Sequence, residues 1–302
     1  KVHPLLARLN QEQFTPTVYK VTDQVYSAVG FSLANCILIA GSDGIVMVDT
    51  TEDRETGEKV LAEFRKIANL PVRAVIYTHN HGDHTGGVRA FVPENAAGQI
   101  DIYAHESLND EVVNTSSVVA PMTTRRAVSM FGVLLPKGEE GLVSAGLGPF
   151  LSRGSRGYLP PTRTYRDRLE VRIAGVKMLL FKSYGDSPDH TAIWLPDSKV
   201  LLAGDSAYYS FPNLYTIRGT KYRDPREWFE ALDELRRLDA EHLVNSHSKP
   251  ISGAAAVREF LTNYRDAIQY VHDQTVRHLN RGLTPDELVD AVKLPEPIST
   301  GA

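Results

Sequence analysis

Four side chains that can bind a metal ion lie within six residues of the sequence, at His79, His81, Asp83 and His84. They follow the apolar run 72–77 at once, and a run of this kind predicts a buried strand. Imidazole and carboxylate groups are the usual ligands of zinc, and glycines inside and after the cluster let the backbone turn tightly around an ion. The alternative is a polar surface loop that happens to contain histidines. The close spacing directly after a strand favours a metal site.

Three further candidates come from later in the chain. His190 follows the turn 185–189, Asp205 follows the apolar run 200–204, and His247 follows the segment 243–246. Each lies where a strand passes into a loop, so all three can meet the first cluster at one edge of a sheet. Taken singly, Asp205 can equally be interpreted as a cap, and the two histidines as loop residues. Beside the first cluster, the interpretation as metal ligands is favoured.

Two β-rich regions must position these residues. The first has apolar or alternating runs, typical of strands, at 18–21, 25–29, 36–40, 45–48 and 72–77. It also has one helical pattern, at 55–68. The second has runs at 169–173, 176–183, 191–195, 200–203 and 243–244, and an amphipathic helix is predicted at 225–238. The fold class is therefore α/β, and the two regions can form two similar layers of a sandwich.

Two segments lie outside this pattern. Residues 105–168 combine a largely helical stretch at 108–130 with a loop rich in glycine and arginine, and we interpret them as an insertion near the active site. Residues 251–302 form a helical extension, in which Thr284 and Pro285 mark the start of a helix. The apolar faces of these tail helices predict either packing on the main domain or a subunit interface, as in a homodimer.

Composition excludes several classes of protein. The 302 residues carry a formal net charge of −4 with mixed signs, which is not the basic footprint of a nucleic-acid binder. No apolar run is long enough to span a membrane, so a soluble bacterial protein is expected. Cys36 is the single cysteine, and its position in a predicted strand favours a place in the core. Exported and cytoplasmic locations both stay open, because the chain begins at Lys1 and a removed signal peptide is compatible with it.

The order of these ligands resembles that of the metallo-β-lactamase superfamily, residue by residue. The resemblance implies an αββα sandwich over residues 1–250 that is followed by the helical extension. It also implies two metal ions, expected to be zinc, with iron or manganese as other candidates. One ion would be held by His79, His81 and His190, and the other by Asp83, His84 and His247. Asp205 would bridge the two.

A narrower resemblance covers nearly the whole chain and lies outside the ligands. The segments that resemble the alkylsulfatase branch are Ala34-Asn35, 72–79, 134–138, 146–148, 213–219, 223–225, 246–247, 250–253 and 264–275. This branch implies hydrolysis of alkyl or aryl sulfate esters, and the extension would be the start of its dimerisation domain. Two features depart from it. First, the branch has glutamates where this chain has His190 and Asp205, in a stretch where its members carry a Pro-Gly-Thr-Glu-Ala-Pro-Ala-Glu-like run. Second, this chain stops near residue 302. A hydrolase of lactones, carboxylic esters or β-lactams is therefore the alternative.

The expected mechanism uses a hydroxide that bridges the two metal ions, with Asp83 and Asp205 holding the metals and orienting this nucleophile. Arg218 is the candidate for binding the sulfate group, and an ion pair with Asp224 is its alternative role. Asn213 and Tyr215 are candidates for lining the same pocket for a small ester substrate; a packed loop is the alternative.

Apolar residues between Met122 and Leu134 would form a wall for an alkyl chain or simply pack their helix. An iron-dependent redox protein and a non-catalytic binding module are the remaining classes.

Overall fold

The computed structural model describes residues 2–96 and 98–296, and two β-sheets form its centre. The first sheet has seven strands in sequential order: β1 (Thr17–Lys20), β2 (Val25–Val29), β3 (Cys36–Ala40), β4 (Ile45–Val48), β5 (Val72–Ile76), β6 (Asp101–His105) and β7 (Arg163–Tyr165). Strands β1 to β4 pair antiparallel, whereas β4 to β7 pair parallel. The strands predicted at 18–21, 25–29, 36–40 and 45–48 are thus confirmed.

The second sheet has six strands and comes from the second half of the chain. Its order is β13 (Ile251–Ser252), β12 (His242–Asn245), β11 (Val200–Gly204), β10 (Thr191–Leu195), β9 (Val176–Lys182) and β8 (Arg168–Ile173). The pair β11 and β12 is parallel, and the other neighbours are antiparallel. The two sheets are the two layers of the predicted sandwich.

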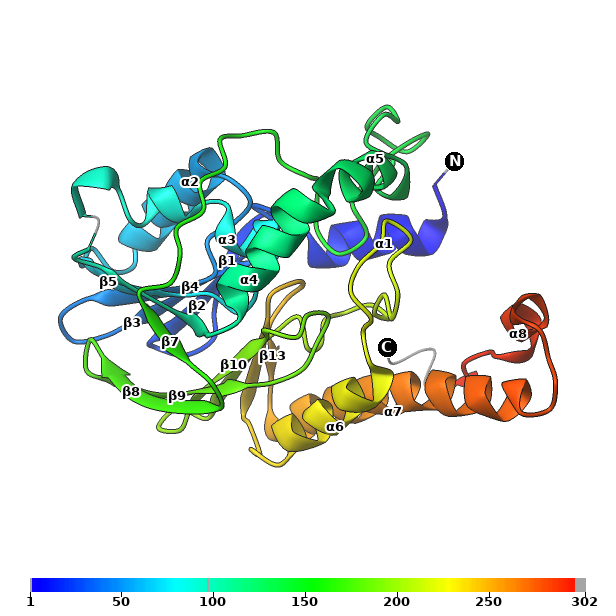
Figure 1. The fold of residues 1–302 in the computed structure, drawn as a ribbon. Coiled ribbons are helices and arrows are strands. Elements are labelled where there is room, and N and C mark those ends of the chain that lie inside the picture. The colour runs from blue at the N-terminus through cyan, green and yellow to red at the C-terminus, as the bar shows by residue number, and fades with distance from the viewer. Residues whose placement is uncertain (1, 97, 297–302) are drawn as a thin grey trace.

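Helices cover the outer faces of both sheets. The α-helices are α1 (Pro4–Gln13), α2 (Arg54–Arg65), α3 (Gly82–Thr85), α4 (Leu108–Val113), α5 (Ala120–Met130), α6 (Pro225–Arg236), α7 (Ala254–Leu279) and α8 (Pro285–Ala291). Short 3₁₀ turns η1 (Val88–Ala90) and η2 (Glu94–Ala96) and a π-helical segment η3 (Asn114–Val118) complete the set. Helices α2 and α4 lie over the first sheet, while α6 and α7 lie under the second (Figure 1). The layers therefore run helix, sheet, sheet, helix.

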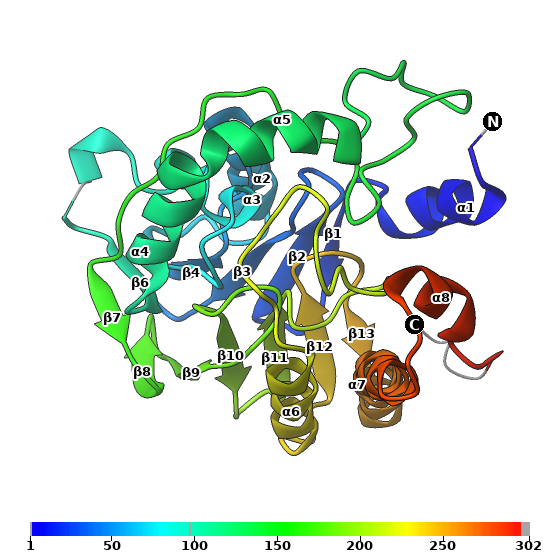
Figure 2. The ribbon, with the colours of Figure 1, turned by 45° about the vertical axis from the view of Figure 1, so that its right-hand side comes forward.

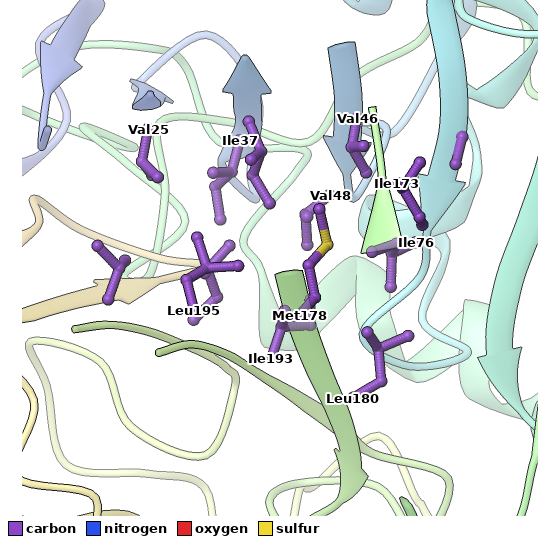
Figure 3. Packing of buried hydrophobic residues seen from close by; sticks show 14 of the residues in the cluster. Val25, Ile37, Val46, Val48, Ile76, Ile173, Met178, Leu180, Ile193 and Leu195 are labelled. Carbon is purple, nitrogen blue, oxygen red and sulfur yellow. The ribbon is translucent and has the colours of Figure 1, made fainter. Parts of the chain in front are cut away.

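Alternation of side chains along the strands explains this layering. In β4, Val46 and Val48 point to the core between the sheets, whereas Ile45 and Met47 pack toward Val60 of α2. Figure 3 shows the core between the sheets, in which residues of β3 and β4 face residues of β9 and β10. Strands that are buried on both faces need continuous apolar sequence, and this is the pattern by which they were predicted.

The insertion and the tail each take a defined course. Figure 2 shows α5 crossing the top of the molecule, above the loop between β11 and α6. In the tail, Phe260, Leu261 and Tyr264 of α7 share a core with Trp228 and Leu232 of α6. Thr284 caps α8 in a capping box with Glu287, as the sequence predicts. Because α7 shares the core of the second layer, a domain boundary at residue 250 stays a prediction.

No helix in the described part of the chain has both the length and the apolar character to cross a membrane. The elements α1, β6 and β7 are among those that were not predicted from the sequence.

Candidate metal centre

Loops at one edge of the two sheets carry the predicted ligands. The segment 78–84 follows β5, residues 183–190 join β9 to β10, Asp205 follows β11, and His247 follows β12. The backbone of Thr191 donates a hydrogen bond to the carbonyl of Thr78 at 2.7 Å, and this bond joins the edges of the two sheets. The ends of strands from both layers therefore bring these side chains together.

The first group of ligand atoms belongs to His79, His81, Asp186 and Asp205. His79 Nε2 lies 2.8 Å from His81 Nδ1 and 3.5 Å from Asp186 Oδ1. His81 Nδ1 lies 3.2 Å from Asp186 Oδ2. His79 is fully buried, and burial, with the neighbouring histidines, lowers its pKa well below the ordinary value. A neutral imidazole is the form that binds a metal ion.

The second group consists of Asp83, His84 and His247. Asp83 Oδ2 lies 3.5 Å from His84 Nε2 and 3.6 Å from His247 Nε2. Asp205 lies between the two groups, since its Oδ2 is 3.8 Å from His79 Nε2, 3.7 Å from His84 Nε2 and 3.1 Å from His247 Nε2. This is the place that the resemblance implies for a bridging carboxylate.

His190 is the predicted ligand that the structure does not bring into either group. Its Nε2 accepts a hydrogen bond from the backbone N–H of Asp205 at 2.9 Å, and its ring stacks on that of His79. The same ring fills the space beside Gly204, where a Cβ would lie 2.6 Å from it. Asp186, four residues earlier in the same loop, takes the place in the first group that the sequence analysis gave to His190. The ligand role of His190 thus stays a prediction, and the geometry makes Asp186 a second candidate for the same place.

Buried carboxylates and carbonyls fix the orientation of the ligand rings. Asp49 Oδ2 lies 2.8 Å from His84 Nδ1, and the carbonyl of Leu33 lies 2.9 Å from His247 Nδ1. In both rings this contact uses Nδ1 and leaves Nε2 for the centre. Asp49 was not predicted as a site residue, although it follows the apolar strand β4 as Asp205 follows β11.

The electrostatics of the two groups fit bound cations. Burial raises the pKa of Asp83, but His84, His247 and His81 outweigh it and hold this pKa well below the usual range. Burial lowers the pKa of His84, yet Asp83, Asp205 and Asp49 raise it well above the usual range. His84 Nε2, Asp186 Oδ1 and Asp205 Oδ1 are buried without a hydrogen-bond partner in the described residues. Such atoms are costly unless a cation satisfies them, so the side chains fit metal ions.

A cavity of about 880 Å³ opens over both groups. One wall comes from α4, η3 and α5, with apolar residues that include Met122, Met130 and Phe131. The opposite wall comes from the loop between β11 and α6. These two walls meet where Gly219 lies close to Met122.

All three predicted substrate contacts line this cavity: Asn213, Tyr215 and Arg218. Arg218 is half buried, and within the described part of the chain its guanidinium has no hydrogen bond or ion pair. Asp224, its predicted alternative partner, instead caps α6 by accepting from the backbone of Arg226. Burial and the nearby Arg223 lower the pKa of Arg218, so an anion at this place would relieve both effects.

Arg223 is a site residue that the sequence analysis did not assign. It is almost fully buried, donates to Asp186 Oδ2 at 3.1 Å and donates to the carbonyl of Asn213 at 2.7 Å. It therefore ties the first ligand group to the cavity loop. Tyr215 is more exposed, at 63%, and lies at the rim.

The loop 150–157 of the insertion is held on the start of α2. Glu52 accepts from the backbone of Ser152 at 2.8 Å and from Arg156 at 3.2 Å, while Glu55 accepts from the backbone of Ser155 at 2.7 Å. Glu52 and Arg156 also line the cavity. Burial and the nearby Asp83 raise the pKa of Glu52 to about 7.

Comparison with known proteins agrees with this fold and site. The sequence model of the metallo-beta-lactamase superfamily matches residues 29–247, a span that includes every ligand described above. The chain therefore belongs to the metallo-β-lactamase superfamily.

Within this superfamily the chain is similar to alkylsulfatases. A linear primary-alkylsulfatase from a Pseudomonas species is 45% identical over 261 residues, which are 85% of this chain and 49% of that protein. An alkyl/aryl-sulfatase from Saccharomyces cerevisiae is 31% identical and matches 97% of this chain and 47% of that protein. The solved structure of a double mutant of the sec-alkylsulfatase PisA1 has a TM-score of 0.93 at 28% identity, over 99% of this chain and 49% of that one. This chain thus spans about half the length of these relatives.

Proposed function

We propose that this chain is a metal-dependent hydrolase of alkyl or aryl sulfate esters. The observation that carries the proposal is Arg218, a guanidinium without a partner in the described residues that lines the cavity over the two ligand groups. A guanidinium is suited to the planar array of oxygens that a sulfate ester presents. The names of the related alkylsulfatases support the same substrate class.

The ligand groups would hold two metal ions, for which zinc is the expected element. His79, His81 and Asp186 would hold one ion, Asp83, His84 and His247 the other, and Asp205 would contact both. Bound there, such ions supply an activated water and polarise the oxygen of the ester.

The residues of the chain then have separate tasks around the reacting ester. The carboxylates of Asp83 and Asp205 orient the attacking water by accepting its hydrogen bonds. Arg218 binds the sulfate oxygens and balances the negative charge that grows as the bond breaks. Asn213 and Tyr215 line the cavity beside it, and the apolar wall of α5 excludes water from the alkyl chain.

Hydrolysis of a small substrate panel tests the proposal. The panel contains dodecyl sulfate, an aryl sulfate, a lactone, a cephalosporin and a phosphodiester, and the metal content of the protein is measured first. We expect release of inorganic sulfate, which His81→Ala abolishes together with one equivalent of metal. Hydrolysis of the carbonyl substrates alone would instead make the chain a lactonase, esterase or β-lactamase. Bound iron with visible absorbance and no hydrolysis would indicate a redox protein.

We also propose that the end of the chain supports a homodimer. Val276 and Leu279 of α7 and Val289 of α8 are exposed at 43%, 46% and 69%. Figure 1 shows this part of α7, with α8, extending beyond the sheets. Light scattering after size exclusion should give twice the mass of the chain, and a monomer at micromolar concentration would contradict the proposal.

A further inference from the structure

A buried hydrogen-bond network joins the two loops that carry the first ligand group. Asn80 Nδ2 donates to Asp189 Oδ1 at 2.6 Å and to Ser187 Oγ at 2.6 Å. All three side chains are buried, with exposed fractions of 4%, 0% and 3% for Asn80, Asp189 and Ser187. Asn80 lies between the ligands His79 and His81, and Asp189 lies three residues after Asp186.

The network has a cost that packing does not explain. Asp189 is a fully buried carboxyl group that forms no ion pair with the described residues, and its Oδ2 has no hydrogen-bond partner there. A small apolar side chain would fill this place without the loss of hydration. Asp189 Oδ1 accepts hydrogen bonds from Ser187 Oγ, within its own loop, and from Asn80 Nδ2. The bond with Asn80 is the one that joins the two loops.

Both the nitrogen and the oxygen of the Asn80 side chain form hydrogen bonds. Its nitrogen donates to the loop of Asp186, while its oxygen accepts a hydrogen bond from Thr115 Oγ1 of η3 at 3.4 Å. The second group has a separate support, because Asp49 contacts His84 and accepts from Ser246 Oγ at 3.0 Å. Thr78 Oγ1 links this support to the first group, since it donates to Asp49 Oδ2 at 2.9 Å and lies 3.0 Å from His79 Nδ1. The hydrogen bond between Asn80 and Asp189 instead joins the loops that carry His81 and Asp186.

We propose that Asn80 and Asp189 form a positioning pair that sets His81 against Asp186 and so controls the metal affinity of the first group alone. The pair fixes the tips of the two loops, which the backbone bond between Thr191 and Thr78 joins only at the strand ends. The inference rests on the proposed metal centre but not on the identity of the substrate. A metal-binding measurement can therefore refute it while the proposed activity stands.

Competition between the metal-free protein and a chromophoric zinc chelator tests the pair. Removing an outer partner of a metal ligand typically weakens binding about 10- to 100-fold. We expect Asp189→Ala and Asn80→Ala to weaken one of two zinc equivalents by this factor and to leave the other unchanged. Asp189→Asn keeps an oxygen that accepts from Asn80, so it should restore most of the affinity.

Three reference variants make the result specific. His81→Ala defines the titration of a protein that lacks the first group, and His247→Ala defines the loss of the second. Leu232→Ala truncates the core of α6, so it lowers the melting temperature without touching either network. The zinc titration of Asp189→Ala should resemble that of His81→Ala, with the first equivalent weakened and the second unchanged. A titration like that of the wild type, or equal weakening of both zinc equivalents, would overturn the proposal.

Discussion

Asp49 Oδ2 lies 2.8 Å from His84 Nδ1, and both side chains are fully buried. The same carboxylate accepts hydrogen bonds from the backbone and hydroxyl of Thr78 and from Ser246. One side chain thus joins the ends of β4, β5 and β12 to a ligand of the second group. Its backbone has a positive φ of 57°, a conformation that asparagine tolerates well.

We predict that Asp49→Asn weakens metal binding at the second group by about 10- to 100-fold. Both oxygens of Asp49 accept hydrogen bonds, one from the backbone of Thr78 and the other from hydroxyl groups and His84. An amide has only one oxygen, so its NH₂ group must face hydrogen-bond donors in either orientation. The same conflict should destabilise the metal-free protein by about 1–3 kcal/mol. A zinc titration and chemical denaturation measure the two effects. Unchanged zinc affinity would show that His84 needs no carboxylate to orient it.

A second prediction concerns Arg218. Arg218→Gln should lower kcat/KM for a sulfate ester by about 10²- to 10³-fold, because a charged donor for the sulfate is lost. Arg218→Lys should recover only part of this activity, since an ammonium group lacks the planar fork of donors. Zinc content should stay constant in both variants.

Arg125→Gln is the matched control for Arg218, because Arg125 is exposed on α5 and does not line the cavity. Inhibition by inorganic sulfate should weaken in the Arg218 variants but not in this control. Equal activity of Arg218→Gln and the wild type would remove the main support for a sulfate substrate.

The sequence predicted the central strands better than the peripheral ones, for a physical reason. Strands such as β3 and β4 are buried on both faces and need continuous apolar sequence, so they could be found from composition alone. The strand β7, with the sequence Arg163-Thr-Tyr, is three residues long and mostly exposed. Its pairing with β6 depends on tertiary contacts that no local pattern encodes.

The site shows a similar division. Asp205 lies one residue after β11 and His247 two residues after β12, so the strand ends bring both side chains to the edge where the cluster lies. Asp186 and His190 lie in one loop four residues apart, and the sequence does not show which one faces the centre. That choice depends on a long-range contact, the hydrogen bond from the backbone of Asp205 that holds His190.

A third prediction concerns the length of the alkyl chain. Burial of one methylene is worth about 0.8 kcal/mol, which is roughly a fourfold change in kcat/KM for each carbon that enters the apolar part of the cavity. Met122→Asn makes this wall polar and should reduce the dependence on chain length. Val118→Asn is the control, since Val118 is 71% exposed and does not line the cavity. A series of alkyl sulfates measures both slopes, and parallel slopes in the two variants would place the alkyl chain elsewhere.

The last prediction concerns pH and Glu52. Burial, with the nearby Asp83, raises its pKa from 4.5 to about 7, against the opposing effects of Ser152 and Arg156. Between these two pH values the folded protein binds more protons than the unfolded chain. The contribution of Glu52 to the free energy of unfolding therefore falls as pH rises from 4.5 to about 7, and it is constant above that range. Glu52→Gln should remove this loss, which is on the order of 3 kcal/mol, in metal-free protein.

Denaturation curves of the wild type and Glu52→Gln, each measured across pH 4.5 to 7, isolate this effect from other titrating groups, because only the difference between the two proteins is used. Bound metal ions beside Asp83 would cancel part of its charge and so lower the pKa of Glu52. The difference between the proteins should therefore shrink when zinc is present. A constant difference across the pH range would mean that Glu52 is ionised throughout and that Arg156 and the backbone of Ser152 outweigh its burial.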